Sequence, residues 1–451
     1  MPKVAAAFEV LKFGGTSLAN YAAMERCASI VGNGSAPRVV VVSASAHVTD
    51  HLHILSKGVK GEGDRKDLID NIKNIQDSIL DCLPDTEALR TKIDAILGHI
   101  ETLSLSLADG EDEAIRDALL SLGEKISSHI FQAVLIRNGV DAKLLDAESI
   151  IRTDSNFGNA EPEPSVIKTL VLRELGAPDT KSVWVVQGFV GADINGKTTT
   201  FGRGGSDYSA ALIAEALEAS ELQIWTDVTG MYSTDPRIES KAERIPRISF
   251  NEAAEMATFG AKILHPKTLM PVVNANIPTF VGSSREPEAG GTHIMPDWEG
   301  DNDLKAVALR RNQTLLTLTS FNMLHSYGFL AKVFEILSKH KVSVDLVTTS
   351  EVSVALTFDK AGDDLKLSKD LLGDLEGLGD LKVDRNLALI ALIGNNLDQN
   401  PGIAANLFSE LIDINLRLIC HGASPHNICF LVDEKVANDV VRRVHKIIME
   451  A

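Results

Sequence analysis

The chain has 451 residues, of which 24% are charged and 44% hydrophobic, and its formal net charge is −18. This is the balance of an ordinary globular protein, and the length allows two to four domains. The acidic excess argues against nucleic-acid binding, which needs clustered Lys and Arg, and against binding to an anionic membrane surface.

The N-terminal sequence MPKVAAAFEVLKFGG has no apolar region followed by a small-residue cleavage site, so we expect no secretory signal. The chain contains no run of 18 or more apolar residues, so we predict no membrane-spanning helix. The four cysteines show neither CxxC nor zinc-finger spacing. We interpret them as free thiols of a cytoplasmic protein.

Strands and helices alternate through the first part of the chain. The segment FEVLKF predicts a strand that runs into Gly14-Gly15 and then a helix over 18–30. The β-branched run at 38–43 is typical of a strand buried on both faces. Further helices are expected over 64–108, 111–138 and 206–219, and further strands over 182–187 and 222–226. This alternation predicts an α/β domain over residues 1–295 with a mostly parallel central sheet, followed by a linker at 297–303.

The C-terminal part repeats a βαββαβ pattern. Its first copy is expected at 314–320, 328–340, 342–349, 352–359, 364–378 and 381–385. Its second copy is expected at 387–394, 402–414, 416–422, 427–433 and 436–449, and 304–310 supplies the missing strand. We therefore predict two ferredoxin-like modules, residues 312–386 inserted within 304–311 plus 387–451.

Two glycine-rich loops have the chemistry of phosphate sites. In KFGGTS, Gly14 and Gly15 allow backbone amides to approach an anion, and Lys12 adds a cation at a predicted helix start. In TTTFGRGGSDY, three glycines surround Arg203, with Asp207 in the first turn of the next helix. A structural turn and a helix cap remain alternative interpretations of the two loops.

Three further segments could contribute to such a site. Thr226 and Asp227 end a predicted strand, and Tyr232 and Arg237 follow them in a turn, where they could contact a nucleotide. FGAKILHP adds Lys262 beside glycine, and the SASAHVTD segment adds hydroxyls. Each has a plain structural alternative as a turn or a half-buried side chain.

Glu124 lies on a mostly apolar helical face, which suggests that it has a partner such as a substrate amine. His47 and His51 have the i, i+4 spacing of zinc ligands, but no third ligand is evident. We therefore predict no bound metal at these histidines.

Together these motifs resemble the aspartokinases of the amino acid kinase family. KFGGTS, SASA–VT, GFVG, TTTFGRGGSDYSA, WTDV-G-Y-TDPR, EMATFGAKILHP and GGT occur in the family's order across essentially the whole chain. The C-terminal repeats resemble the family's paired ACT domains, and NMLHSYGFLAKVFEIL resembles its lysine-sensitive, single-function members. The resemblance implies a three-layer kinase domain followed by two ACT domains, the first inserted in the second.

The resemblance also implies an activity, which is transfer of the γ-phosphoryl group of ATP to the side-chain carboxylate of L-aspartate. Mg²⁺ is implied as a cofactor, held largely by phosphates and water. Lys12 and Asp207 would be catalytic. Aspartate would contact Thr49, Glu124, Arg203 and Ser206. The nucleotide would contact Lys12, Gly14, Gly15, Ser43, Thr226, Asp227, Tyr232, Arg237 and Lys262. The chain departs from the family at His47, where Gly is usual, and at Asp50, where Asn is common.

The ACT repeats imply feedback inhibition by lysine and a homodimer, possibly paired further as a dimer of dimers. The implied lysine site consists of Met323, Ser326, Phe329, Leu330, Ser343, Val344, Asp345, Thr349, Ser350 and Glu351. Asp345 and Glu351 suit the two ammonium groups, although they could be ordinary strand-end charges. Two other functions stay open: another amino acid kinase, acting on glutamate or a carbamate, and a non-catalytic amino-acid sensor built on an inactive kinase fold.

Overall fold

The computed structural model describes residues 8–34, 36–176, 183–260, 266–296, 304–358 and 367–450. The chain divides into two compact units. Unit 1 consists of Met1–Met231, Arg244–Phe250 and Lys262–Trp298, and unit 2 of Tyr232–Glu243, Asn251–Ala261 and Glu299–Ala451. Two short segments from within the predicted 1–295 domain thus belong to unit 2. The predicted linker at 297–303 lies outside the described residues.

Unit 1 is built on an eight-stranded sheet with the order β3-β4-β2-β1-β7-β9-β10-β8. The strands are β1 Glu9–Phe13, β2 Arg38–Val42, β3 Ala142–Leu145, β4 Val183–Gln187, β7 Glu221–Thr226, β8 Arg247–Ser249, β9 Thr279–Ser283 and β10 Gly291–Met295. Neighbouring strands are parallel, except for β9 and β10. The predicted mostly parallel sheet is confirmed.

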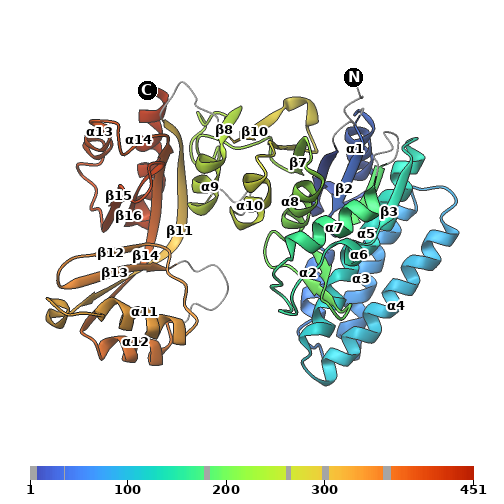
Figure 1. Ribbon diagram of the computed structural model, residues 1–451, viewed down its shortest axis with the longest axis horizontal. Coiled ribbons are helices and arrows are strands. Elements are labelled where there is room, and N and C mark those ends of the chain that lie inside the picture. The colour runs from blue at the N-terminus through green and yellow to red at the C-terminus, as the bar shows by residue number, and fades with distance from the viewer. Residues whose placement is uncertain are drawn as a thin grey trace. The chain divides into compact units, whose positions relative to one another are not determined.

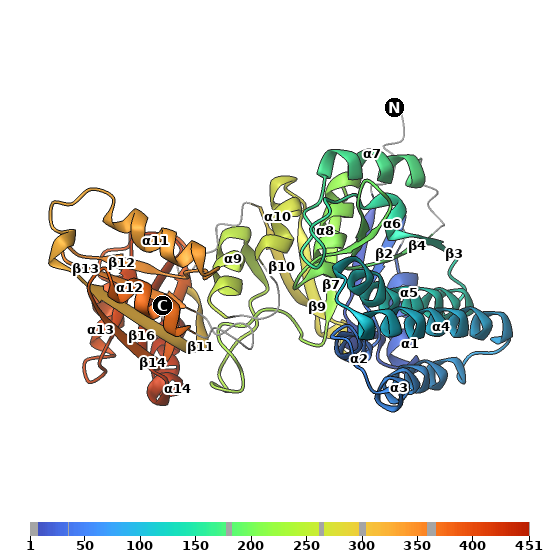
Figure 2. The ribbon, with the colours of Figure 1, turned by 90° about the horizontal axis from the view of Figure 1, so that it is seen from below.

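Helices cover this sheet, and all five residues of β2, Arg38 and four valines, are therefore buried. The helices are α1 Tyr21–Gly32, α2 Val48–Leu55, α3 Glu62–Leu80, α4 Glu87–Asp109, α5 Glu113–Arg137, α6 Ala147–Ile150, α7 Pro164–Leu175, α8 Gly205–Leu217 and α10 Pro266–Asn274. Helix α5 packs on β2, β3 and β4, and α8 packs on β1, β7 and β2. Figures 1 and 2 show α3 and α4 on the outside of this layer. A small antiparallel hairpin, β5 Val190–Ala192 and β6 Thr198–Thr200, leads into α8.

The predicted helix over 18–30 was placed too early. Residues Gly15–Leu18 form the short 3-10 helix η1, and α1 begins only at Tyr21. The reason is a local cap that the prediction overlooked. Asn20 has an extended backbone, and its side chain accepts a hydrogen bond of 2.9 Å from the Ala23 amide, which fixes the start of α1.

Unit 2 contains a six-stranded antiparallel sheet with the order β12-β13-β11-β14-β16-β15. The strands are β11 Leu304–Thr319, β12 Val347–Thr349, β13 Ser353–Phe358, β14 Asp380–Gly394, β15 Leu418–His421 and β16 Asn427–Asp433. The helices are α9 Phe250–Thr258, whose first residue belongs to unit 1, and α11 Phe329–Lys339, α12 Lys369–Glu376, α13 Ile403–Ser409 and α14 Ala437–Glu450. The short helices η2 Pro287–Ala289 in unit 1, and η3 Phe321–Met323 and η4 Glu434–Val436 in unit 2, complete the elements.

The two predicted modules share this one sheet. The strands expected at 304–310 and 314–320 are one strand, β11, and those expected at 381–385 and 387–394 are one strand, β14. Asn312 and Asn386 take left-handed backbone angles where the register shifts, so the chain kinks without leaving the sheet. Each module keeps its own hydrophobic core, one beneath α11 and α12 and one beneath α13 and α14. The predicted insertion of the first module in the second is confirmed.

No helix in the described part of the chain is long and apolar enough to cross a membrane.

Candidate functional site

The carboxyl ends of β1, β2 and β7 meet at one edge of the unit 1 sheet. β1 lies between β2 and β7, and the strand order runs through β2 and β4 on one side of β1 and through β7 and β9 on the other. The order of the strands therefore reverses direction at β1. Open parallel sheets bind ligands at such a switch point. The loops that follow these strands carry the two predicted motifs that begin at Gly14 and Ser43, and the pair Thr226 and Asp227.

An ion pair joins the two predicted catalytic residues. Lys12, near the end of β1, places Nζ 2.7 Å from Oδ1 of Asp207 in the first turn of α8. Both side chains are largely buried, with exposed fractions of 11% and 13%. An ammonium group with so little water around it interacts more strongly with a nearby anion than an exposed lysine does. The structure therefore presents a fixed cation at the edge of the sheet.

The glycine loop after β1 lies against the loop after β2. A Cβ atom at Gly15 would lie 2.9 Å from the carbonyl oxygen of Ala44, so only glycine permits this approach. The Gly14 amide already donates a 3.1 Å hydrogen bond to the carbonyl of Trp225. The loop opens the single-turn helix η1 rather than a long helix, so the helix-dipole contribution expected from the sequence is small.

The loop after β2 begins with the predicted nucleotide residue Ser43 and leads into α2, which contains the predicted substrate residue Thr49. The Ser43 amide donates to the carbonyl of Phe13 at 3.1 Å, which ties this loop to β1. His47 precedes α2 with a φ of 69°, a left-handed conformation that is easiest for glycine. The loop therefore keeps a glycine-like backbone despite the substitution. Thr49 is exposed in the first turn of α2.

Glu124 on α5 is the buried carboxylate of this region. Its side chain is only 4% exposed, and Oε1 accepts a 3.1 Å hydrogen bond from the Ala44 amide. Burial raises the pKa of Glu124 to about 8. Ser127, one turn further along α5, donates to the carbonyl of Ser43 at 2.7 Å. Helix α5 thus holds the loop after β2 at two points.

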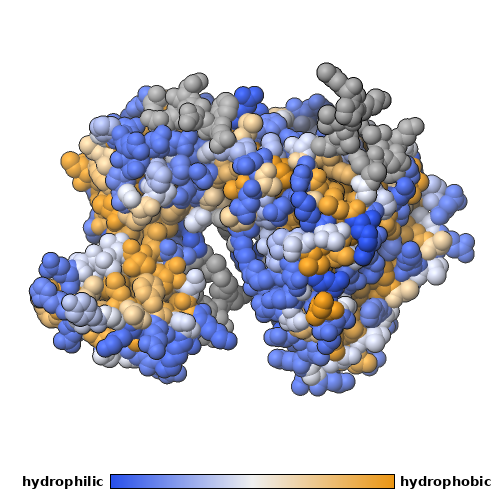
Figure 3. Space-filling view, viewed as in Figure 1, coloured by the Kyte–Doolittle hydropathy of each residue, from blue (hydrophilic) through white to orange (hydrophobic). Residues whose placement is uncertain are grey.

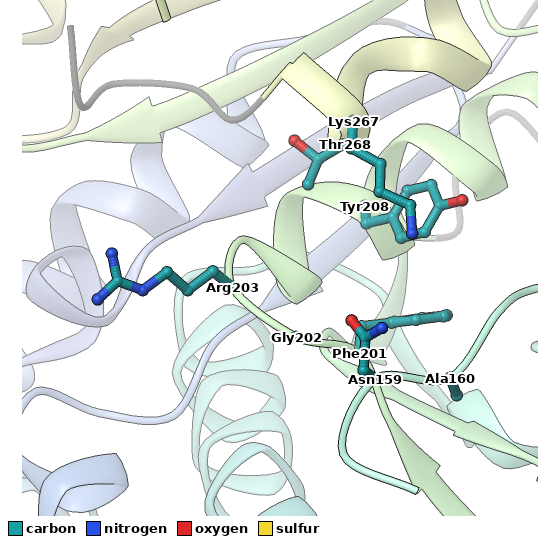
Figure 4. A pocket seen from close by; sticks show the side chains of 8 residues that line it. All are labelled: Asn159, Ala160, Phe201, Gly202, Arg203, Tyr208, Lys267 and Thr268. Atoms are coloured by element: carbon teal, nitrogen blue, oxygen red, sulfur yellow. The ribbon is translucent and has the colours of Figure 1, made fainter. Parts of the chain in front are cut away.

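Arg203 and Ser206 lie on either side of a tight turn. Gly204 caps α8 with a φ of 73°, so the chain turns sharply between the exposed Arg203 and the helix. A cavity of about 120 Å³ lies beside this turn. It is lined by Asn159, Ala160, Phe201, Gly202, Arg203, Tyr208, Lys267 and Thr268. Figure 4 shows the Arg203 guanidinium pointing away from the other lining side chains, so it is available outside this cavity.

Asp117 is a buried acidic residue that the prediction from the sequence did not include. Asp117 on α5 is 0% exposed and accepts hydrogen bonds from Gly158 and Thr200. Asp117 precedes Glu124 by seven residues, so two acidic residues recur after two helical turns on an apolar face. That spacing was the signal that could have revealed it.

The predicted nucleotide residues fall in both units. Thr226 ends β7, and its hydroxyl donates to the exposed Asp227 at 3.2 Å. Tyr232 and Arg237 belong to unit 2, where the exposed Arg237 guanidinium pairs with Asp235 at 2.7 Å. Lys262 lies outside the described residues.

The residues predicted to bind the effector lysine form two groups at opposite ends of the β12–β13 pair. The Ser320 amide donates to the carbonyl of Val352 at 2.8 Å, which brings the segment holding Met323 next to the turn at Ser350 and Glu351. The segment at Ser343, Val344 and Asp345 lies at the other end, where the Asp345 amide donates to Thr357. Phe329 and Leu330 begin α11, Ser326 is exposed just before it, and Thr349 ends β12. The Asp345 carboxylate lies 3.4 Å from a guanidinium nitrogen of Arg310.

Comparisons with known proteins agree with this arrangement. Residues 8–283 match the amino acid kinase family, and residues 390–447 match an ACT domain. The chain is 48% identical to lysine-sensitive aspartokinase 3 of Escherichia coli, over 98% of this chain and 99% of the relative. The chain belongs to the aspartokinases of the amino acid kinase family. The predicted family is confirmed.

Other aspartokinases show the same likeness. Aspartokinase 1, chloroplastic, of Arabidopsis thaliana is 35% identical over 98% of this chain and 80% of its own length. A crystal structure of E. coli aspartokinase III with aspartate and ADP superposes with a TM-score of 0.88, covering 97% of this chain and 99% of the other. A crystal structure of the same enzyme with lysine and aspartate superposes with a TM-score of 0.83, covering 98% of this chain and 99% of the other. Both are 48% identical to this aspartokinase chain.

Proposed function

We propose that this chain transfers the γ-phosphoryl group of ATP to the side-chain carboxylate of L-aspartate, giving 4-phospho-L-aspartate and ADP. The observation that carries the proposal is the buried Lys12–Asp207 pair at the switch point of a sheet, in a chain that is 48% identical to an aspartokinase whose structure holds aspartate and ADP. We propose ATP as the phosphoryl donor because the structure of E. coli aspartokinase III contains ADP, the product that ATP would leave.

The reaction needs no general base. A carboxylic acid with a reference pKa near 3.9 is already ionised at neutral pH, so the acceptor oxygen is a ready nucleophile. The difficulty is to bring two anions together and to stabilise the negative charge on the transferred oxygens. Lys12 would supply a fixed cation for that charge, and Asp207 would keep its ammonium group in place.

Two groups would hold the amino acid. Arg203 would pair with its α-carboxylate, and Glu124 would accept its ammonium group. The raised pKa of Glu124 suits this task, because a bound ammonium would favour the ionised carboxylate and return that pKa toward its usual range. Thr49 and Ser206 would add hydrogen bonds to the same substrate.

The nucleotide would lie along the carboxyl edge of the sheet. We assign its phosphates to Lys12 and to the loops at Gly14, Gly15 and Ser43. Thr226 and Asp227, at the end of β7, would add to the nucleotide site within unit 1. The nucleotide contacts of Tyr232, Arg237 and Lys262 stay predictions. Because the Gly14 amide is already bonded to Trp225, its part would be to leave room for a phosphate rather than to donate to it.

Magnesium would be bound mainly through the nucleotide. Among the described residues there is no group of three His, Cys, Asp or Glu side chains suited to a metal ion. We propose that this hard cation would be held by phosphate oxygens and water. When bound, the ion would neutralise charge on the phosphates.

We further propose that lysine inhibits the enzyme through the first ACT module, and that two copies pair there. Phe321 and Tyr327 are 81% and 101% exposed, and Leu324, Leu330, Phe334 and Val347 add apolar area between 37% and 43% exposed. Figure 3 shows apolar residues over the part of the molecule that holds α11 and β13. Such a surface is costly in water.

Trapping of the acyl phosphate tests the reaction. With ATP, Mg²⁺ and hydroxylamine, we expect aspartate to give the hydroxamate and glutamate to give little. A strong signal with glutamate and none with aspartate would make the protein another amino acid kinase, and no signal with any amino acid would favour a sensor.

A further inference from the structure

Asp117 is a buried carboxylate for which the proposed reaction has no use. It lies on α5 with an exposed fraction of 0%. Burying a carboxylate is costly unless its oxygens receive hydrogen bonds. Its neighbours therefore show what the fold gains from it.

Three donors from two loops converge on Asp117. Oδ2 accepts from the Gly158 amide at 2.8 Å and from the Thr200 amide at 2.7 Å. Oδ1 accepts from the Thr200 hydroxyl at 2.9 Å. Burial raises the pKa of Asp117, and the hydrogen bonds oppose that shift. One side chain thus joins α5 to the turn at Gly158 and to the end of β6.

Both segments lie close to Arg203. Thr200 is the last residue of β6 and precedes Arg203 by three residues. The two loops also bond to each other, because the Ala160 amide donates to the carbonyl of Thr200 at 3.1 Å. Asn159 and Gly202 line the cavity beside Arg203. A displacement of Thr200 would therefore move the backbone that carries the guanidinium.

The same helix holds the other end of the amino-acid site. Glu124 follows Asp117 by seven residues, two turns along α5, and accepts a hydrogen bond from Ala44. Asp117 fixes the loop of Arg203, and Glu124 contacts the loop of Ser43. A single rigid helix thus sets the spacing between the two charged groups assigned to the substrate.

We propose that Asp117 is a positioning residue that sets the distance between Arg203 and Glu124, and thereby the affinity for aspartate. This inference rests on the proposed function. Asp117 touches neither substrate in this scheme, since its oxygens are occupied by Gly158 and Thr200.

The chemistry of the site separates two variants. In Asp117→Asn, the amide oxygen can accept from both backbone N–H groups, and the amide nitrogen can donate to the Thr200 hydroxyl. In Asp117→Ala, two buried N–H groups lose their acceptor, so the loop must move to reach water. Asparagine should therefore rescue what alanine loses.

Steady-state kinetics of hydroxamate formation test the proposal. We expect Asp117→Ala to lower kcat/KM for aspartate about 10- to 100-fold. Asp117→Asn should stay within about threefold of the parent enzyme, and KM for ATP should change less than about threefold in both. Leu119→Ala is the matched control, because it removes equally buried atoms from α5 and a leucine side chain makes no hydrogen bond to either loop. It should lower Tm and leave KM for aspartate unchanged.

A second measurement protects the test against misfolding. Thr200→Val removes only the hydroxyl bond, and we expect it to raise KM for aspartate about three- to tenfold. Hydrogen exchange at residues 198–204 should quicken in Asp117→Ala and Thr200→Val but not in Leu119→Ala. Unchanged aspartate kinetics in Thr200→Val, or equal losses for aspartate and ATP in Asp117→Ala, would overturn the proposal. A parent enzyme without hydroxamate formation would overturn the proposed function instead.

Discussion

The catalytic edge of unit 1 and the first ACT module of unit 2 differ in how far their functional side chains are exposed to solvent. At the catalytic edge, Lys12, Asp207 and Glu124 are nearly excluded from water, with side-chain exposures of 11% and 13% for the pair and 4% for Glu124. In the ACT module, Glu351 is exposed, and Phe321 projects an apolar ring into solvent. Buried charges act strongly on a small ligand, whereas exposed groups gain strength only when a partner or ligand covers them.

This contrast shows at which step the groups for each function become arranged, during folding or during binding. The Lys12–Asp207 ion pair is formed during folding, before any substrate arrives, whereas Glu124, with its raised pKa, would ionise when the ammonium group of the substrate binds. The regulatory groups would become buried only on dimer formation and lysine binding. Substitutions at the catalytic edge should therefore have large effects on rate, and substitutions in the ACT module smaller effects on affinity.

The largest effect is expected at Lys12. Lys12→Ala removes the fixed cation, and we expect kcat to fall about 10²- to 10³-fold while KM for aspartate changes little. Steady-state hydroxamate formation measures both. Lys143→Ala on the exposed side of β3 is the control and should leave kcat unchanged. A kcat for Lys12→Ala within twofold of the parent would remove Lys12 from the reaction.

Glu124→Gln keeps the shape of the side chain but removes the charge that would pair with the ammonium of aspartate. A hydrogen bond between charged groups is worth more than a neutral one, so we expect KM for aspartate to rise about 10- to 100-fold. KM for ATP should stay close to the parent value. Equal changes for both substrates would mean that Glu124 supports the fold of the site rather than the amino acid.

Phe321→Asp tests whether the exposed apolar surface is a contact between copies. A central aromatic residue of an interface contributes about 2 kcal/mol or more, so we expect the dimer Kd to rise about 30-fold. Analytical ultracentrifugation measures it. Ile194→Asp, a substitution of an equally exposed residue at 79% in unit 1, should leave the molecular mass unchanged. A parent protein that is monomeric at all concentrations would contradict the proposed dimer.

Glu351→Ala should weaken inhibition without harming catalysis. Loss of the exposed Glu351 carboxylate should raise the lysine concentration for half-inhibition about fivefold, which is within the usual range of allosteric coupling. Glu335→Ala on the exposed face of α11 is the matched control. An unchanged lysine response in Glu351→Ala would show that the effector site lies elsewhere.

The smallest effect is a dependence of stability on pH. The pKa of Glu124 is raised by burial to about 8 in the folded protein, against a model-peptide value of 4.5. Between these values the folded state holds a proton that the unfolded state has lost, so the free energy of unfolding falls as pH rises toward 8. Glu124→Gln carries no titrating group. It should therefore gain about 3 to 6 °C in Tm relative to the parent at pH 8.5, and much less at pH 5.

Thermal unfolding at both pH values measures this difference, in the absence of substrates. Glu335→Gln, an exposed substitution, should give a curve parallel to that of the parent. Parallel curves for Glu124→Gln as well would contradict a raised pKa.

Much of the fold could be predicted because its signals are local. Four consecutive valines in β2, Val39–Val42, predict a strand buried on both faces, and they are buried in the structure. The start of α1 could not be placed well, because one side chain, Asn20, decides it. The joining of the ACT strands depends on Asn312 and Asn386 in left-handed conformations, which a periodic pattern does not reveal.

The candidate site was predictable where a residue type is unusual in its setting. A glutamate on an apolar helical face pointed to Glu124, and a lysine before two glycines pointed to Lys12. Asp117 was missed, because its donors, Gly158 and Thr200, are distant in sequence and two of the three bonds come from backbone amides. Nothing in the sequence marks a backbone N–H as a partner. Likewise, residues 232–243 belong to unit 2 through long-range packing that the motif order conceals.

One assay tests both regions at once. Aspartyl hydroxamate formation is measured with ATP, Mg²⁺ and aspartate, first during a titration with lysine and then with threonine. We predict turnover with aspartate that falls as lysine is added and is unaffected by threonine at the same concentrations. Absence of turnover with aspartate, or turnover that lysine does not change, would contradict the account of a preorganised catalytic edge governed by an exposed ACT module.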